Sequence, residues 1–192
     1  MLDFVKKYSG GQYSQNGEAG IIDECLRRLD WGEGIAVEFG APTKEFCSNI
    51  FHLTKIPTWR CFYFDPNPQE EGIDQLYVTP ENVNKFIPEC DVLSIDVDSI
   101  DYSIWKAYTG KPAIVIIEIN SSISPTDDEP VNSMQDGTAY KPMCELAIEK
   151  GYFVLCHTGN IIAVDNQYRS LFPEVTGDPV KDHHLYFNTS WL

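Results

Sequence analysis

Four polar side chains follow directly on two apolar runs of the chain. Asp96 and Asp98 come after the β-branched run at 92–95, and Glu118 and Asn120 close the next such run. Runs with so little polar alternation are typical of parallel strands that are covered on both faces. Open α/β sheets bind their ligands outside the carboxyl ends of the strands. These four side chains are therefore candidates for function.

The acids among them suit two kinds of chemistry. Asp96 and Asp98 lie two positions apart, so their side chains would face the same side of a continuing strand. Clustered carboxylates raise one another's pKa, which favours a general base. With Glu118 they also form an oxygen-only ligand set for Mg²⁺, Mn²⁺ or Ca²⁺. Both roles stay open at this stage.

A second constellation indicates a cofactor site. The turn Glu38-Phe39-Gly40-Ala41 ends an earlier apolar run, and Asp65 ends the next one, about 25 residues later. A glycine after the first strand lets a ligand approach the backbone, and an acid after the second accepts the hydroxyls of a ribose. The chain has no GxGxxG sequence, which disfavours NAD and FAD. S-adenosylmethionine (SAM), which has no pyrophosphate and whose sulfonium suits an acidic pocket, fits better.

The elements that position these residues alternate along the chain. Apolar periodicity and turn residues predict strands at 35–39, 60–64, 75–78, 92–96, 113–119, 152–156 and 160–164. They predict helices at 16–29 with Asn16 as its cap, near 47–53, after a Thr79 cap, at 101–108 and at 140–150. The last two strands flank His157-Thr158-Gly159 and form a hairpin. The pattern predicts a Rossmann-like three-layer α/β/α sandwich of about seven strands, mostly parallel, with an antiparallel hairpin strand at the C-terminal end.

Length and composition set the broad class. At 192 residues we expect one domain, 1–192, with an N-terminal helical segment 1–33, a sheet core 34–164 and a C-terminal extension 165–192. Hydrophobic residues make up 43% of the chain, which argues against disorder. No apolar run reaches the length of a membrane span, so we expect no membrane insertion.

Charge and cysteines narrow the partners and the location. The net charge of −15 repels phosphate backbones, so we expect no nucleic acid partner. The six cysteines include no CxxC pair, and we expect reduced, mostly buried thiols and a cytoplasmic location. No feature of the sequence indicates an oligomeric state.

Four blocks of the chain resemble, in the same order, the corresponding blocks of FkbM-like class I SAM-dependent methyltransferases. They are residues 13–22 (YSQNGEAGII), 37–41 (VEFGA) with Ser48-Asn49, 93–98 (LSIDVD) with Asp101-Tyr102 and 105–107, and 115–120 (VIIEIN). The resemblance covers nearly the whole chain. It implies a class I methyltransferase domain that O-methylates a sugar, a glycan or another small hydroxylated acceptor.

The resemblance also implies site residues. Those that would contact SAM are Ser14, Gln15, Glu18, Glu38, Gly40, Ala41, Ser48, Asn49, Asp65 and Asp96. Asp96, Asp98 and Asn120 are the expected catalytic residues, which would orient the acceptor and take its proton, and a metal would be held by Asp96, Asp98 and Glu118. Asp101 is as readily a helix cap. The long loop at 121–138 is the expected acceptor lid, and a lone turn histidine such as His157 is expected to be solvated or capping.

Two other functions remain as alternatives. Asp96-Val97-Asp98 is a DxD sequence, which in metal-dependent glycosyltransferases holds the metal that bridges the donor diphosphate. A non-catalytic binding module with a methyltransferase fold is the other. Nucleotide-sugar binding without SAM binding would indicate a glycosyltransferase. Weak or absent SAM binding, with no activity lost when Asp96 or Asp98 is replaced by alanine, would indicate a binding module.

Overall fold

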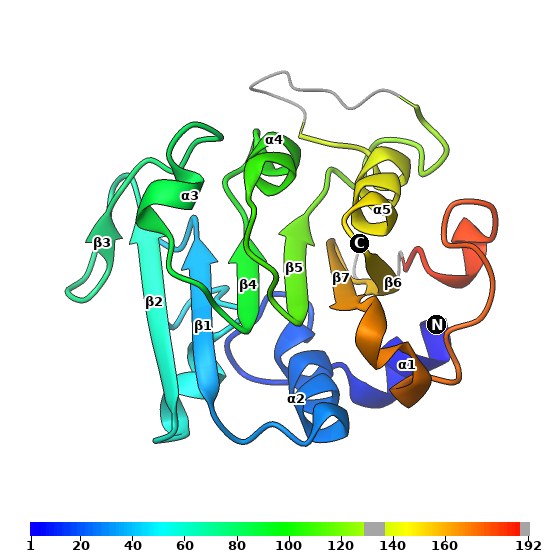
Figure 1. Ribbon diagram of the computed structural model, residues 1–192, viewed down its shortest axis with the longest axis horizontal. Coiled ribbons are helices and arrows are strands. Elements are labelled where there is room, and N and C mark those ends of the chain that lie inside the picture. The colour runs from blue at the N-terminus through cyan, green and yellow to red at the C-terminus, as the bar shows by residue number, and fades with distance from the viewer. Residues whose placement is uncertain (129–136, 189–192) are drawn as a thin grey trace.

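A mixed sheet of seven strands lies at the centre of the molecule (Figure 1). The computed structural model describes residues 1–128 and 137–188, and the strand order is β3-β2-β1-β4-β5-β7-β6. The strands are β1 Gly34–Phe39, β2 Trp59–Asp65, β3 Asp74–Gln75, β4 Val92–Ile95, β5 Ile114–Glu118, β6 Tyr152–His157 and β7 Asn160–Asp165. Only β7 runs antiparallel to its neighbours, β5 and β6. The predicted fold class is confirmed.

The register of the central strands explains where the polar side chains emerge. Ile95 pairs with both Phe39 and Ile117, so β1, β4 and β5 end at the same level of the sheet. Every residue of β4 is buried, as expected of a strand covered on both faces. Asp96, the residue after β4, and Glu118, the last residue of β5, therefore leave the core side by side.

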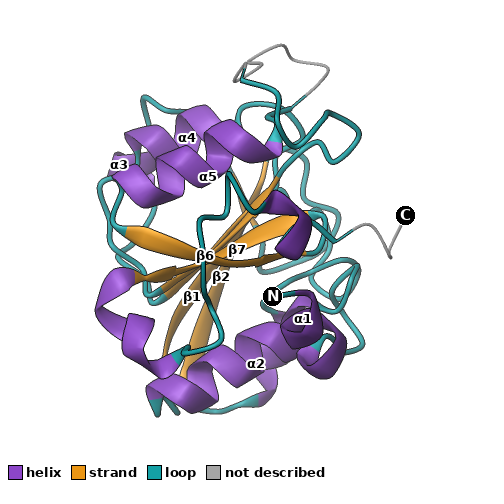
Figure 2. Cartoon of the chain, turned by 90° about the vertical axis from the view of Figure 1, so that its right-hand side faces the viewer, coloured by secondary structure: helices purple, strands orange, loops and turns teal. Residues whose placement is uncertain are grey.

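Helices cover the sheet on both faces, as Figure 2 shows, with α1 and α2 on one side and α3, α4 and α5 on the other. Their bounds are α1 Leu2–Tyr8, α2 Glu18–Leu29, α3 Val83–Phe86, α4 Asp101–Ala107 and α5 Tyr140–Glu149. The apolar residues at helical spacing in α2 are all buried; they are Ile21, Ile22, Cys25, Leu26 and Leu29. The described residues also include three 3₁₀ turns, at Phe51–Lys55, Asn166–Leu171 and His183–Leu185.

Local contacts override several sequence expectations at element ends. Asn16 does not cap the second helix; Gly17 occupies that position in the left-handed conformation, and the Asn16 N–H donates to the Glu18 carboxylate at 2.8 Å. Thr79 caps no helix either, since its N–H donates to the Asn82 side chain and α3 begins only at Val83.

Other predicted elements are shorter or of another type. The expected strand at 75–78 is reduced to Asp74–Gln75, and the helix expected near 47–53 is the 3₁₀ turn at Phe51–Lys55. The expectation of mostly buried thiols holds for only half of the six free cysteines, because Cys47 is exposed and Cys61 and Cys90 are half-buried. None of the described helices is long and apolar enough to span a bilayer.

Candidate functional site

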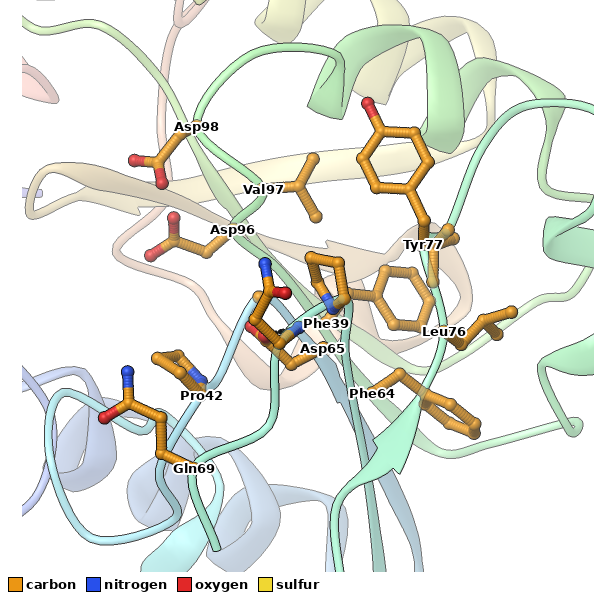
Figure 3. A pocket seen from close by; sticks show the side chains of 14 residues that line it. Phe39, Pro42, Phe64, Asp65, Gln69, Leu76, Tyr77, Asp96, Val97 and Asp98 are labelled. Atoms are coloured by element: carbon orange, nitrogen blue, oxygen red, sulfur yellow. Dashed lines mark hydrogen bonds between the residues drawn. The ribbon is translucent and has the colours of Figure 1, made fainter.

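A pocket of about 280 Å³ opens at the carboxyl ends of β1, β2 and β4 (Figure 3). It is lined by Phe39, Gly40, Pro42, Phe64, Asp65, Pro66, Asn67, Gln69, Leu76, Tyr77, Val78, Asp96, Val97 and Asp98. Four residues predicted from the sequence thus meet in one cavity, namely Gly40, Asp65, Asp96 and Asp98. This is the edge at which open α/β sheets bind ligands.

Position 40, in the wall of this pocket, requires glycine because a side chain there would clash with the backbone. Its φ is +79°, and a Cβ added there would lie 1.5 Å from the backbone oxygen of Asp96. The Gly40 N–H donates to the Phe64 oxygen at 3.0 Å. The turns after β1 and β4 therefore touch backbone to backbone, which only glycine permits.

Asp65 presents one carboxylate oxygen that the protein does not use. Its Oδ1 accepts the Asn67 N–H at 2.6 Å, whereas Oδ2 has no hydrogen-bond partner among the described residues. The residue is buried and lines the pocket. Oδ2 is thus available to a hydroxyl of a bound ligand.

Residues 76–78 form an apolar part of the pocket wall next to Asp65, whose backbone oxygen accepts the Leu76 N–H at 3.0 Å. Leu76, Tyr77 and Val78 follow β3, and Figure 3 shows the Tyr77 ring beside Val97. Tyr77 is 55% exposed, so its ring is accessible to a ligand in the pocket. The sequence analysis missed this wall, whose only signal was a short apolar run with an aromatic residue after the third strand.

Asp96, Asp98 and Glu118 form a carboxylate cluster at the edge of the pocket. One oxygen of each lies within 4.8 Å of one oxygen of each of the other two. Burial, and then the neighbouring acids, raise the pKa of Asp96 and of Glu118 above the ordinary range of carboxyl groups. The cluster can therefore hold a proton near neutral pH, or take up a cation.

Asp96 and Asp98 do not lie on a continuing strand as expected, but on a turn that follows β4. β4 ends at Ile95, and Asp98 turns back in the left-handed region with φ +63°. Asp101, which is buried, fixes this turn by accepting the N–H groups of Val97 at 2.8 Å and Ser99 at 3.1 Å. Asp101 thus holds the turn before α4 and does not cap the helix, whose N-cap is Ile100, and burial raises the pKa of its carboxyl group.

Glu38 lies behind the pocket and anchors its loop. Its carboxylate accepts hydrogen bonds from the Ser48 hydroxyl at 2.5 Å, the Asn49 N–H at 2.8 Å and the Ser94 hydroxyl at 3.1 Å. Burial raises the pKa of Glu38, although these bonds oppose the shift. Three of the predicted cofactor residues, Glu38, Ser48 and Asn49, therefore form a buried support, and the pocket wall does not include them or Ala41.

The N-terminal segment approaches the same edge without lining the pocket. The Ser14 hydroxyl accepts the Ala19 N–H at 3.0 Å, and Gln15 is exposed. Glu18 is fully buried, and its carboxylate accepts the Thr158 hydroxyl at 2.7 Å and the Asn160 amide at 3.2 Å. Glu18 thereby joins the start of α2 to the turn between β6 and β7.

Asn120 is held by its own loop. Its side-chain oxygen accepts the Ser122 N–H at 2.9 Å, and its N–H donates to the Thr138 oxygen at 2.9 Å. It does not line the pocket. The expected acceptor lid at 121–138 is described only at its two ends, because residues 129–136 lie outside the described part of the chain.

His157 differs from the solvated turn residue expected from the sequence. It is fully buried, stacks on Phe187 with ring centroids 4.3 Å apart, and lies 2.8 Å from the Ser121 hydroxyl through Nε2. Its Nδ1 accepts the Asn188 N–H at 3.2 Å. Burial lowers the pKa of His157 to about 4, so the ring is neutral at physiological pH.

Fold and site together define a Rossmann-like α/β protein with a ligand pocket at the carboxyl edge of its sheet. No protein-family model and no curated protein matches the chain. Among solved structures it is similar to CalO1, a methyltransferase in calicheamicin biosynthesis in its SAH-bound form, with a TM-score of 0.41 and 14% identity. The match covers 78% of this chain and 55% of CalO1, so the chain spans about half the length of that protein. A likeness of this strength establishes neither a family nor an activity for this chain.

Proposed function

We propose that this protein is a SAM-dependent O-methyltransferase of the FkbM-like kind that methylates a hydroxyl of a sugar, a glycan or another small molecule. The observation that carries the proposal is the convergence of Gly40, Asp65 and the Asp96–Asp98 turn on one pocket. The six free cysteines agree with action in the cytoplasm.

The residues of the pocket fit SAM in three respects. The free Oδ2 of Asp65 suits a ribose hydroxyl, and the apolar wall at Tyr77 suits a purine base. Gly40 lets the turn after β1 pack against the Asp96 backbone, which brings both turns to the pocket wall. The carboxylate cluster, whose acids repel one another, favours a positively charged ligand group such as a sulfonium.

The chemistry requires alignment and removal of one proton. When bound, SAM supplies an electrophilic methyl group on a positively charged sulfur. The acceptor oxygen bonds to the methyl carbon as the carbon–sulfur bond breaks, and that electron pair neutralises the sulfur. One carboxylate of the neighbouring Asp96 and Glu118, whichever is ionised when the acceptor binds, would receive the hydroxyl proton, which contributes roughly 10²–10⁴-fold to rate.

A divalent metal is the alternative means of activating the hydroxyl. Asp96, Asp98 and Glu118 offer the carboxylate oxygens that Mg²⁺, Mn²⁺ and Ca²⁺ prefer, and their oxygens lie close enough to share one ion. A metal there would lower the pKa of a bound hydroxyl in place of the carboxylate base. Activity that survives EDTA would indicate the carboxylate route, and loss of activity restored by one of these ions would indicate the metal route.

Methyl transfer from labelled SAM to a panel of methyl glycosides, with and without EDTA, tests the proposal. We expect labelled methyl ethers with at least one glycoside, and loss of product in the Asp96→Asn variant. Binding of UDP-glucose without binding of SAM would contradict the proposal and favour the glycosyltransferase alternative.

A further inference from the structure

The turn between β6 and β7 is unusual because it is buried. His157, Thr158 and Asn160 are between 0% and 4% exposed. The Ile119 N–H donates to the Gly159 oxygen at 3.4 Å, so the turn packs directly against the end of β5. Its side chains therefore lie in the interior, next to the end of β5, and not on the outer surface.

Asn160 is held in one orientation by Glu18. Its Nδ2 donates to Glu18 Oε1 at 3.2 Å, and the same oxygen accepts the Thr158 hydroxyl at 2.7 Å. If the Asn160 amide were flipped, its Oδ1 would lie against Glu18 Oε1, and neither oxygen could donate a hydrogen bond. The Glu18 carboxylate therefore selects the orientation in which Nδ2 faces it. The carbonyl end, Oδ1, consequently points away from Glu18.

Asn160 Oδ1 is buried and has no hydrogen-bond partner among the described residues. Buried polar atoms of native proteins are nearly always hydrogen-bonded, and those left open call for an explanation such as a ligand. Leaving this oxygen unpaired costs stability without benefit to the fold. A ligand that donates a hydrogen to it would recover that cost.

The strand register places Asn160 beside Glu118, a member of the carboxylate cluster. Asn160 pairs with Glu118 across β5 and β7, so both side chains lie on the same face of the sheet. Glu118 in turn lies within 4.8 Å of Asp96 and Asp98, oxygen to oxygen. An ionised carboxylate and an amide oxygen both accept hydrogen bonds, so a ligand that contacts one of each would donate two hydrogens.

We propose that Asn160 determines acceptor specificity, with its Oδ1 accepting a hydrogen bond from a second hydroxyl next to the one that is methylated. The substrate class is therefore a molecule with adjacent hydroxyl groups, such as a sugar, rather than an isolated alcohol. Glu18 is the positioning residue that turns Oδ1 toward the site. This inference rests on the proposed methyltransferase function and names the substrate class of the same site.

The test compares methyl glycosides with their matched deoxy analogues, each lacking one hydroxyl next to the methylated position. Wild-type kcat/KM should fall about 10-fold or more for the deoxy analogue, because a site built for a hydroxyl is left unpaired. In Asn160→Leu, kcat/KM for the glycoside should fall by a similar factor, and that for the deoxy analogue by less than about 2-fold. Glu18→Gln should lose part of the same discrimination. Asn166→Leu, the same change at an exposed position outside the site, should behave like the wild type.

Titration with SAH separates the possible outcomes. If all variants bind SAH like the wild type and only discrimination changes, the inference holds. If Asn160→Leu lowers both substrates equally, Asn160 is structural and the inference is wrong. SAH binding without transfer to any glycoside would also contradict it and would leave the methyltransferase proposal standing, whereas absence of SAH binding to the wild type would contradict the proposal itself.

Discussion

The carbonyl oxygen of Asp96 lies against Gly40 so closely that a Cβ at residue 40 would come within 1.5 Å of it. This contact joins the turn after β1 to the turn after β4. Because Asp65 and Asp98 line the same pocket, the contact fixes the distance between the side proposed for the cofactor and the side proposed for the acceptor.

Gly40→Ala should therefore destabilise the protein and weaken SAH binding. The positive φ alone costs about 1–3 kcal/mol for a residue with a Cβ, and the clash with Asp96 adds to it. Gly32→Ala is the matched control, because an added Cβ there meets nothing within 4 Å. Urea unfolding of both variants checks the prediction, and equal stability of the two would contradict it.

Asp65→Asn should weaken SAH binding by about 10-fold or more, since a hydrogen bond to a charged group typically contributes 1.5–3 kcal/mol. The asparagine retains an oxygen for the Asn67 N–H, so the turn at 65–67 should persist. Asp74→Asn, at an exposed position on β3, removes the same charge away from the pocket wall. Calorimetry that gives the same affinity for both variants would exclude a role of Asp65 in binding.

Asp96→Asn should make the protein more stable at pH 8 than the wild type, with little gain at pH 4. Burial and the neighbouring acids raise the folded-state pKa of Asp96, so the folded protein holds a proton that the unfolded chain releases above about pH 4. Wild-type stability therefore falls as pH rises through this range, and the variant lacks the dependence. Asp74→Asn, which makes the same change at an exposed position outside the carboxylate cluster, is the control. Thermal melts between pH 4 and 8 measure the stability of each variant relative to the wild type. If Asp96→Asn raised stability by the same amount at every pH, the explanation would be wrong.

His157 should make the stability of the folded protein fall as pH drops below about 6.5, which is the opposite pH dependence to that of Asp96. Burial lowers its pKa to about 4, so the unfolded chain takes up a proton below about pH 6.5 that the folded protein refuses. Its contribution to stability is present above pH 6.5 and is lost as pH falls toward 4. In His157→Gln this loss should disappear, whereas His184→Gln, at an exposed position, should keep the wild-type slope. Parallel slopes for the two variants in urea unfolding would show that His157 is protonated in the folded state.

Much of the sheet could be predicted because its strands carry their own signal. The apolar runs that form β4 and β5 differ from their predicted bounds by one residue or less at each end. Their carboxyl ends placed Asp96 and Glu118 at one edge, as expected from parallel strands. The local alternation of strands and helices was enough for the fold class.

The support around the pocket could not be predicted, because it depends on residues far apart in the chain. Glu18 meets Thr158 and Asn160 across 140 and 142 positions, and nothing near any of them in sequence indicates the pairing. His157 stands in a turn sequence that usually faces solvent, and its burial depends on residues distant in the chain, such as Tyr140 and Phe187, whose rings pack against it. The bounds of short elements such as β3 and α3 were predicted wrongly for a related reason, because tertiary contacts rather than local propensity set their ends.

Calorimetric titration of the purified protein with SAM and with SAH, in the presence and absence of EDTA, tests the central claim most directly. The pocket at Gly40, Asp65 and Asp96 predicts saturable binding of both ligands at one site per chain, lost in Gly40→Ala and weakened in Asp65→Asn. Absence of heat with either ligand, from a protein whose unfolding is cooperative, would contradict the methyltransferase proposal.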